Sequence, residues 1–342
     1  GRGTAVAATA ADERALTKGV VPPSLKERLV DVHIPDDAYD SVLPTFWHVL
    51  KSGGTAVQDL AQDCFALRVA SEVGNGAEEI GDDELKLVEV NQGHRHVNVD
   101  TTTSEGIVRA GRLGLAPSRL ADILFTPLLV ETADSILSPQ FPGRMFALFR
   151  HPVHRAVSQF YYLRGATWEP TYNPSFGSMT LQEWARTSHV ESDWMVRSLV
   201  NKMEGAITDE DLQNAKEVLR NKCVLGLLDR MEESVDIFRA YFGFGYDEAT
   251  GERKPDVDQC VSSMLADKKR GNRSDHPFPI EEGDDTWKEL EGKNSADMVL
   301  YNYARKLFDE QKGLAENRAA ERRRRAAPPA VDEQPAAIEN TY

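Results

Sequence analysis

The chain lacks the features that define several broad classes of protein. Its 342 residues include three cysteines, Cys64, Cys223 and Cys260, which are too few for a disulfide framework. No apolar run approaches the length that spans a bilayer, and no signal peptide is recognisable. Basic side chains number 40 against 55 acidic ones, so the net charge is −15. That balance argues against a general nucleic-acid-binding surface, and any basic chemistry must be local.

The cysteines and the composition suggest how the chain is organised. Cys64 falls on the apolar stripe of a predicted helix, where we expect it to pack as a small hydrophobe. A single disulfide between Cys223 and Cys260 is an open alternative. We expect a flexible leader or stem over residues 1–40, a folded domain over 41–312 and a disordered tail over 313–342. The tail carries four consecutive arginines at 322–325, followed by Ala/Pro-rich sequence.

Residues 46–65 have the pattern strand, glycine loop, helix. An apolar run ends in Lys51-Ser52-Gly53-Gly54-Thr55, and apolar residues then recur at helical spacing. Glycines allow a tight turn in which backbone N–H groups converge, and the helix N-terminus adds unpaired donors. The loop is therefore a predicted anion cradle to which Lys51 brings a full charge. It is not a Walker A motif, because the lysine precedes the glycines; this argues against a kinase or GTPase.

A second segment about a hundred residues later has a related pattern. Residues 145–149 form an apolar run, and Arg150 stands at its end. Pro152 suits the first turn of a following helix, and Ser158 lies two turns into that helix.

Together these segments resemble the two nucleotide-binding elements of sulfotransferases that use 3′-phosphoadenosine 5′-phosphosulfate (PAPS). The first resembles the 5′-phosphosulfate loop, Lys-Ser/Thr-Gly-Gly-Thr. The second resembles the 3′-phosphate element, Arg-Asp/His-Pro-x-x-Arg-x-x-Ser. Residues 224–234 and 297–304 resemble stretches of the carbohydrate branch, which is Golgi-type and uronyl 2-O-like. All four occur in the family's order, so the resemblance covers roughly residues 44–310.

The resemblance implies a fold that the periodicity also supports. It implies an α/β, P-loop-NTPase-like three-layer sandwich with a central parallel sheet flanked by helices. The alternation of apolar runs and helical patterns independently predicts a parallel sheet. Both loops should then lie at the carboxyl ends of the strands, where such sheets bind ligands.

The resemblance also assigns residues to PAPS. Lys51 would contact the bridging oxygen and act in catalysis, and Arg150 and Ser158 would bind the 3′-phosphate. The phosphosulfate would be held by Lys51, Ser52, Gly53, Gly54, Thr55 and Ala56, although the family often has Ser or Thr in place of Ala56. Arg155 would brace the turn. No metal is expected, because the SO3 unit carries less charge than a phosphoryl group. Without the paired motifs, Lys51 would be a solvated lysine and Arg150 part of a helix-end ion pair.

The segment Gly93-His94-Arg95-His96-Val97 supplies the candidate general base. An acceptor hydroxyl must lose its proton, and histidine has a suitable pKa. The segment follows a predicted strand at 84–90 and resembles the Gly-His element of uronyl sulfotransferases, so His94 is the first choice and His96 the second. Two alternatives stand beside this: a hydrogen-bonded structural histidine, and a metal site, for which no third ligand is evident.

These inferences converge on one predicted function. The chain is expected to transfer the sulfuryl group of PAPS to a carbohydrate hydroxyl, with a polysaccharide favoured as the acceptor. Tyr161, Tyr162, Arg164 and Trp168 would face that acceptor, although core packing explains the tyrosines equally well. A small-molecule or protein acceptor, or a catalytically silent nucleotide- or glycan-binding scaffold, is the alternative.

The resemblance further implies a cellular location. It implies the Golgi lumen or secretory pathway, with room for a membrane anchor upstream of Gly1. The tripeptide Asn272-Arg273-Ser274 matches the glycosylation sequon of a secreted glycoprotein. No nucleic-acid partner is expected, and the oligomeric state is left open.

Overall fold

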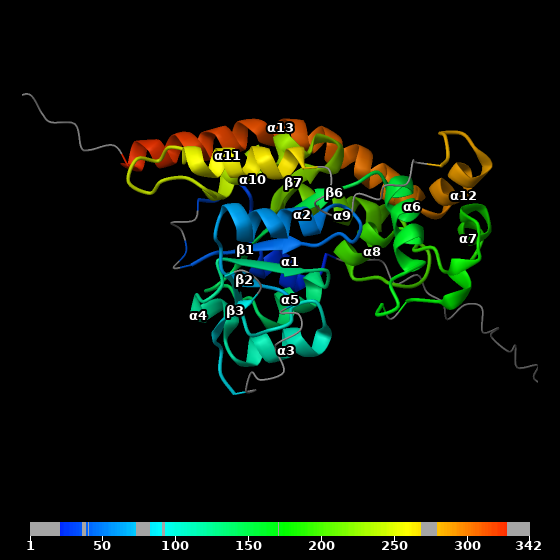
Figure 1. Ribbon diagram of the computed structural model, residues 1–342, viewed down its shortest axis with the longest axis horizontal. Helices are drawn as coiled ribbons and strands as arrows, with labels where there is room; N and C mark the ends of the chain where they lie inside the picture. Colours follow the sequence, from blue (N-terminus) through cyan, green and yellow to red (C-terminus); the bar gives the residue numbers. More distant parts are fainter. Residues whose placement is uncertain are drawn as a thin grey trace, which may run out of the picture.

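The computed structural model describes residues 21–35, 39, 41–72, 83–90, 93–169, 171–267 and 279–326. Its centre is a seven-stranded sheet with the order β3-β4-β2-β5-β1-β6-β7 (Figure 1). Only β3 and β4 pair antiparallel; every other neighbouring pair is parallel. The strands are β1 (Leu43–Trp47), β2 (Val69–Ala70), β3 (Leu87–Val90), β4 (His94–Val97), β5 (Ile123–Thr126), β6 (Gly143–Phe149) and β7 (Cys223–Leu227). The expected α/β class with a mostly parallel sheet is confirmed.

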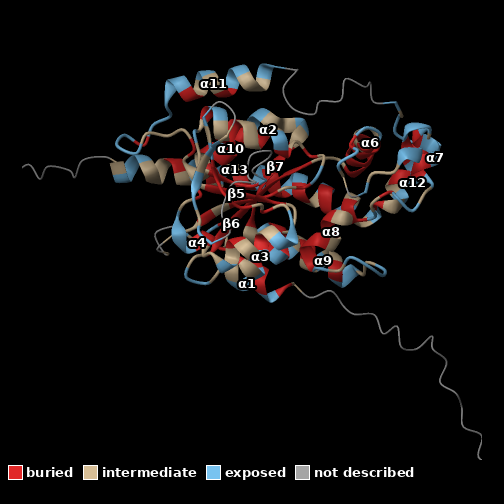
Figure 2. Cartoon of the chain, turned by 60° about the horizontal axis from the view of Figure 1, so that its bottom comes forward, coloured by how far each residue is buried: buried red, intermediate tan, exposed pale blue. Residues whose placement is uncertain are grey.

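Helices cover both faces of the sheet, an arrangement compatible with a three-layer sandwich. Figure 2 shows α2, α10 and α11 on one side of the strands and α1, α3 and α4 on the other. The α-helices are α1 (Pro23–Arg28), α2 (Gly54–Asp59), α3 (Ser104–Arg112), α4 (Leu115–Ser118), α5 (Leu129–Ser135), α6 (Pro152–Leu163), α7 (Leu181–Ala185), α8 (Trp194–Val200), α9 (Asp209–Lys222), α10 (Met231–Phe242), α11 (Pro255–Ala266), α12 (Asp285–Lys293) and α13 (Ser295–Ala326). A π-helical segment, η2 (Leu60–Cys64), continues α2, and short 3-10 turns are η4 (Pro174–Gly177) and η5 (Leu228–Arg230).

The central strands are apolar along their whole length because both of their faces are covered. Every residue of β5, β6 and β7 is buried, as expected for parallel strands between two helical layers. Phe46 of β1 and Phe146 of β6 pack edge to face at 5.0 Å between centroids. This core holds the strand ends, and the loops that leave them, in fixed positions.

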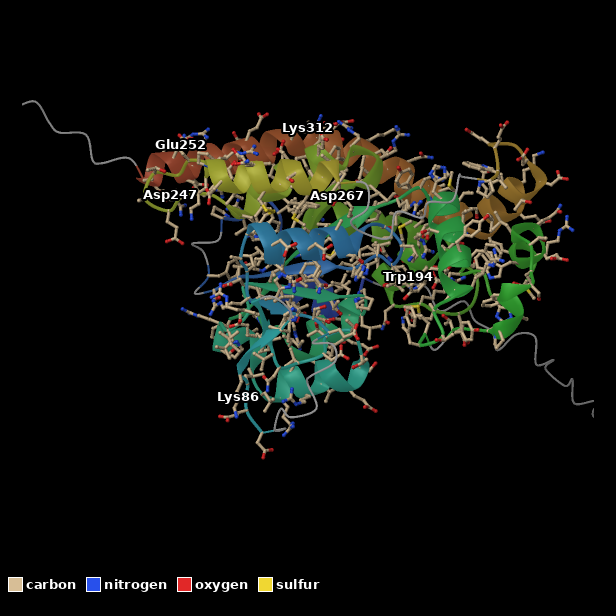
Figure 3. The ribbon with its side chains drawn as sticks, in the orientation of Figure 1. Lys86, Trp194, Asp247, Glu252, Asp267 and Lys312 are labelled. Atoms are coloured by element: carbon tan, nitrogen blue, oxygen red, sulfur yellow. A yellow bond between two sulfur atoms is a disulfide. The ribbon has the colours of Figure 1, made fainter. Side chains whose placement is uncertain are left out.

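The parallel strands all end at one edge of the sheet, and a helical lobe stands beyond that edge. The lobe contains α6, α7, α8 and α12 (Figure 1). Trp194 of α8 stacks on Trp47 of β1 at 5.8 Å where the sheet meets the lobe (Figure 3). The chain leaves β1 toward β2 on one side, whereas β6 and β7 lie on the other side of β1. Such a switch point is where open α/β sheets form a ligand crevice.

The β7 edge of the sheet is closed by α13. The side-chain amide of Gln311 accepts a hydrogen bond from the N–H of Leu225 and donates one to the carbonyl of Cys223, both at 2.8 Å. These two bonds satisfy backbone groups that an edge strand otherwise leaves unpaired. The long C-terminal helix is therefore part of the fold.

The expected domain boundaries differ from the structure at both ends. The leader expected over residues 1–40 contains α1, and Leu25 and Leu29 beside it are buried in the main core. The tail expected over 313–342 contains the last part of α13, where Ala315 and Ala319 are buried. The folded unit thus extends past residues 41 and 312, because apolar side chains on both flanking helices pack against it. Residues 1–20 and 327–342 lie outside the described residues.

Both expectations about cysteine are wrong. Cys64 and Cys260 form a disulfide, with their Cα atoms 5.6 Å apart, whereas Cys223 is a free and buried thiol on β7. Cys64 and Leu60 pack against Val257 and Val261 of α11, whereas Val57 and Ala61 of the same helical segment pack in the main core. The disulfide ties the end of the helical segment that follows the glycine loop to α11.

Candidate active site

The loop after β1 has the backbone geometry of an anion-binding turn. Lys51 has φ 64° and Gly53 has φ 91°, both left-handed, while Ser52 between them is not. Alternation of this kind turns successive N–H groups toward a common point, as in the backbone nests that bind phosphate. A left-handed lysine is uncommon and is sustained only where its surroundings constrain it.

Gly54, the first residue of α2, is pressed against the end of β1. A Cβ added at Gly54 would lie 2.2 Å from the ring of His48, so only glycine fits there. The backbone N–H of His48 donates to the carbonyl of Thr126 on β5 at 2.8 Å, which anchors His48 to the sheet. Burial, and then the charge of Lys51, lowers the pKa of His48 to about 4, so this imidazole is neutral at pH 7.

The polar groups of the loop divide into paired and unpaired ones. The hydroxyl of Ser52 is fully buried and has no hydrogen-bond partner among the described residues. Such a group in a native fold calls for a ligand or a water to complete it. The N–H of Ala56 instead donates to the carbonyl of Gly53 at 3.1 Å. This internal hydrogen bond competes with the contact to phosphosulfate that was expected for Ala56. Thr55 is exposed at the start of α2.

A second cation from the neighbouring strand joins the loop. Arg150, at the end of β6, donates from Nη1 to the carbonyl of Lys51 at 3.1 Å. Burial, followed by the charge of Arg150, lowers the pKa of Lys51 to about 8, and Glu169 opposes this shift. Burial also lowers the pKa of Arg150. Neither cation forms an ion pair with a carboxylate of the described residues. Two half-buried cations side by side favour an anion between them.

The helix that follows Arg150 carries the remaining residues of the second motif. Ser158 is 6% exposed on α6, the helix that begins two residues after Arg150. Arg155 is fully buried and its Nη1 pairs with Glu191 at 2.6 Å, which fits a bracing role. The structure therefore brings the Lys51 loop and Arg150 together and places Ser158 on the adjoining helix.

Two acidic side chains that the sequence analysis missed, Glu169 and Glu72, act on Tyr162, whose ring contacts Lys51. The ammonium of Lys51 lies 3.7 Å from the centre of the Tyr162 ring, and the Tyr162 hydroxyl donates to Glu169 Oε1 at 2.5 Å. Burial, the hydrogen bond to Glu169 and the charges of Glu169 and Glu72 together raise the pKa of Tyr162 to about 12. Glu72 follows β2 by two residues, at the carboxyl edge of the sheet. Its position just after a short apolar run is the feature of the sequence that could have identified Glu72 as a candidate.

His94 and His96 lie far from this cleft, so the expectation that they point into it is wrong. Strand β4 runs parallel to β2, with His96 in register with Val69, so His94 begins β4 at the opposite edge of the sheet. His94 pairs with Asp63 at 2.7 Å and His96 with Gln62 at 2.5 Å, both near the end of the helical segment that Gly54 begins. At about 1.5 Å per residue, this contact is roughly 13 Å along the helix from the loop. A general base must lie within hydrogen-bond reach of its substrate.

Two further stretches singled out in the sequence, residues 224–234 and 297–304, meet near Arg150. Asp229, from residues 224–234, hydrogen-bonds Tyr301, from residues 297–304. The Tyr301 ring packs edge to face on His151 at 5.5 Å, and the charge of Arg150 helps to lower the pKa of His154, after burial. Segments far apart in the chain thus form one continuous wall from β6 to β7.

No family model and no curated protein matches the chain. Within the described ranges, no three His, Cys, Asp or Glu side chains are placed to share a metal ion. No described helix is long and apolar enough to cross a membrane.

Sulfate tests whether the charge of Lys51 serves anion binding. Sulfate keeps its charge between pH 7 and pH 9, so a change in its affinity reports on the protein. Lys51 loses its proton as the pH rises through about 8, and sulfate affinity should therefore fall about tenfold over that range. Calorimetric titration at matched ionic strength measures this.

Two variants control the sulfate experiment. Lys51→Ala should bind sulfate weakly at both pH 7 and pH 9, without the tenfold fall in affinity. Lys288→Ala, which removes an exposed lysine on α12, should keep the wild-type fall in affinity. If sulfate affinity still falls between pH 7 and pH 9 in Lys51→Ala, the group that loses its proton is not Lys51.

Proposed function

We propose that the chain is a PAPS-dependent sulfotransferase that transfers a sulfuryl group to a carbohydrate hydroxyl, and that its domain is a P-loop-NTPase-like three-layer sandwich. The observation that carries the proposal is the pairing of the Lys51 loop with Arg150 at the switch point of the sheet. A strand-end lysine and a strand-end arginine from neighbouring parallel strands offer two anion sites in one crevice. PAPS has two such anionic ends.

The described residues fit this donor. The unpartnered hydroxyl of Ser52 and the N–H groups at the start of α2 would hold the phosphosulfate, with Lys51 beside them. Arg150 would hold the 3′-phosphate through its guanidinium fork, with Ser158 adding a hydroxyl. Asp229, His154 and the aromatic rings near them would form the wall on the Arg150 side.

The chemistry asks little of the protein beyond placing charge and accepting one proton. When bound, PAPS supplies a sulfuryl group on a leaving 5′-phosphate. Lys51 and the loop amides stabilise the charge that develops on that phosphate. A base takes the proton of the acceptor hydroxyl as its oxygen attacks sulfur and the bond from sulfur to the phosphate oxygen breaks. A metal is not required for these roles.

The base is a carboxylate of the cleft in this proposal, in place of His94. Glu72 and Glu169 both act electrostatically on Tyr162, whose ring contacts Lys51. Glu169 already accepts the Tyr162 hydroxyl, so its charge is engaged in holding Tyr162 and Lys51. Glu72 is exposed at the strand end and is our choice for the base.

The Cys64–Cys260 disulfide supports a secretory location for this enzyme. Structural disulfides persist in oxidising compartments such as the secretory lumen and are rare in the cytosol. The glycosylation sequon at Asn272 lies outside the described residues.

The donor assignment predicts a specific nucleotide preference. Adenosine 3′,5′-bisphosphate should bind and raise the melting temperature, because it binds the native state only. Arg150→Ala should weaken this binding by about 2 kcal/mol or more, since a charge-assisted contact is lost. Arg164→Ala, which removes an arginine at the end of α6 and outside the proposed nucleotide site, should bind normally. Stronger stabilisation by ATP or GTP than by the 3′-phosphorylated nucleotide would contradict the proposal.

The base assignment predicts which side chain limits turnover. Glu72→Gln should slow single-turnover transfer roughly a hundredfold, the range typical of acid–base catalysis, while nucleotide affinity stays unchanged. Glu169→Gln should have the smaller effect. His94→Ala changes a residue of β4 that contacts the far end of the helical segment, and should transfer at a near-normal rate. If His94→Ala were inactive and Glu72→Gln active, His94 would be the general base and the placement of the acceptor beside Glu72 would be refuted.

A further inference from the structure

Trp168 is an exposed aromatic side chain beside the candidate active site. It is 73% exposed, the largest exposed fraction among the large hydrophobic side chains that the structure describes. Single exposed apolar residues are common on protein surfaces, so exposure alone points to no ligand. Trp168 differs from the other exposed apolar residues because its contacts connect it to the Lys51 site.

One tyrosine connects Trp168 to Lys51. The indole N–H of Trp168 donates to the Tyr162 hydroxyl at 3.3 Å, and the two rings stand at 75° with centroids 6.3 Å apart. Tyr162 also contacts the Lys51 ammonium, which lies 3.7 Å from the ring centre. These two distances, 6.3 Å and 3.7 Å, put the indole centre within about 10 Å of the lysine.

The backbone around Trp168 is held in hydrogen-bonded turns. The N–H of Glu169 donates to the carbonyl of Ala166 at 3.0 Å, and the Glu169 carboxylate accepts the Tyr162 hydroxyl. Arg164 donates to the carbonyl of Gly177 at 3.0 Å, which ties the start of this loop to η4. The indole is therefore oriented before any ligand arrives, which lowers the entropic cost of binding.

We infer that Trp168 is a platform on which one sugar ring of the acceptor stacks, next to the ring that receives the sulfuryl group. This inference rests on the proposed function. An indole offers a flat apolar face with a polar edge, which matches the C–H face of a pyranose and its surrounding hydroxyls. A small phenol would instead call for an enclosed, mainly apolar pocket.

The contacts of Tyr162 with both Trp168 and Lys51 bear on the length of the acceptor. We assign the sugar ring stacked on the indole as the neighbour of the ring whose hydroxyl meets the sulfuryl group beside Lys51. A second, linked ring would then lie toward Lys51. The acceptor that uses Trp168 is therefore at least a disaccharide, and a methyl glycoside of a single sugar cannot use this contact while it reacts.

The test uses binding rather than turnover, so that it is independent of the donor. Of the five tryptophans, Trp47, Trp184 and Trp287 are buried and Trp194 is partly buried. Acrylamide should therefore quench mainly Trp168 fluorescence. We expect at least one of three unsulfated tetrasaccharides, from cellulose, laminarin and chondroitin, to protect it from quenching. The matching methyl monosaccharides should protect far less.

Variants separate stacking from a general surface effect. Trp168→Ala should weaken tetrasaccharide binding by tenfold or more in calorimetry, and Trp168→Phe by a few-fold, because a smaller ring remains. Met203→Ala removes another exposed apolar side chain, 56% exposed, and should bind as the wild type does. In transfer assays Trp168→Ala should raise the KM for tetrasaccharide more than it lowers kcat.

The results that overturn the inference are distinct from those that overturn the sulfotransferase proposal. The platform is refuted if no tetrasaccharide protects Trp168, or if Trp168→Ala binds a tetrasaccharide as tightly as the wild type. Failure of the wild type to bind adenosine 3′,5′-bisphosphate would refute the proposed function instead. If p-nitrophenol protected Trp168 from quenching as well as a tetrasaccharide does, Trp168 would be a site for a phenolic acceptor and not for a sugar.

Discussion

Two half-buried cations meet at a single backbone turn, and much of the structure serves to hold them there. Lys51 and Arg150 come from neighbouring strands and repel one another, which helps to lower the pKa of the lysine. Keeping them together costs folding free energy that the apolar core must offset. The buried strands, the contact of Gly54 with His48 and the long helix along β7 all fix this turn. An anion bound between the cations would relieve the repulsion.

Much of this centre could be predicted from short stretches of sequence. Residues 46–65 and 145–158 each contain a strand, a polar turn and a helix within one local pattern, and local patterns survive folding. Parallel pairing of β1 with β6 then brings Lys51 and Arg150 to the same edge without further assumptions. The loop conformation follows from its glycines, although the left-handed Lys51 could not be foreseen.

The predictions that failed, and the residue that was overlooked, all depended on contacts between distant segments. His94 follows a strand, as expected, but it begins the return strand of a hairpin and so lies at the amino edge of the sheet. The partner of Cys64 depends on where α11 crosses η2, across a sequence separation of 196 residues. Glu72 was missed because its electrostatic effect on Tyr162 depends on where α6 packs, which the local sequence does not show. Strand direction and helix placement are global properties, which a single sequence encodes only indirectly.

The most direct measurement of the central claim is an experimental structure with adenosine 3′,5′-bisphosphate. We expect the 5′-phosphate on the N–H groups that open α2, within reach of the Ser52 hydroxyl, with the Lys51 ammonium withdrawn from Tyr162 to meet it. We expect the 3′-phosphate on the guanidinium of Arg150. A nucleotide bound elsewhere, or one whose 3′-phosphate faces solvent while Arg150 keeps its bond to the Lys51 carbonyl alone, would contradict the account.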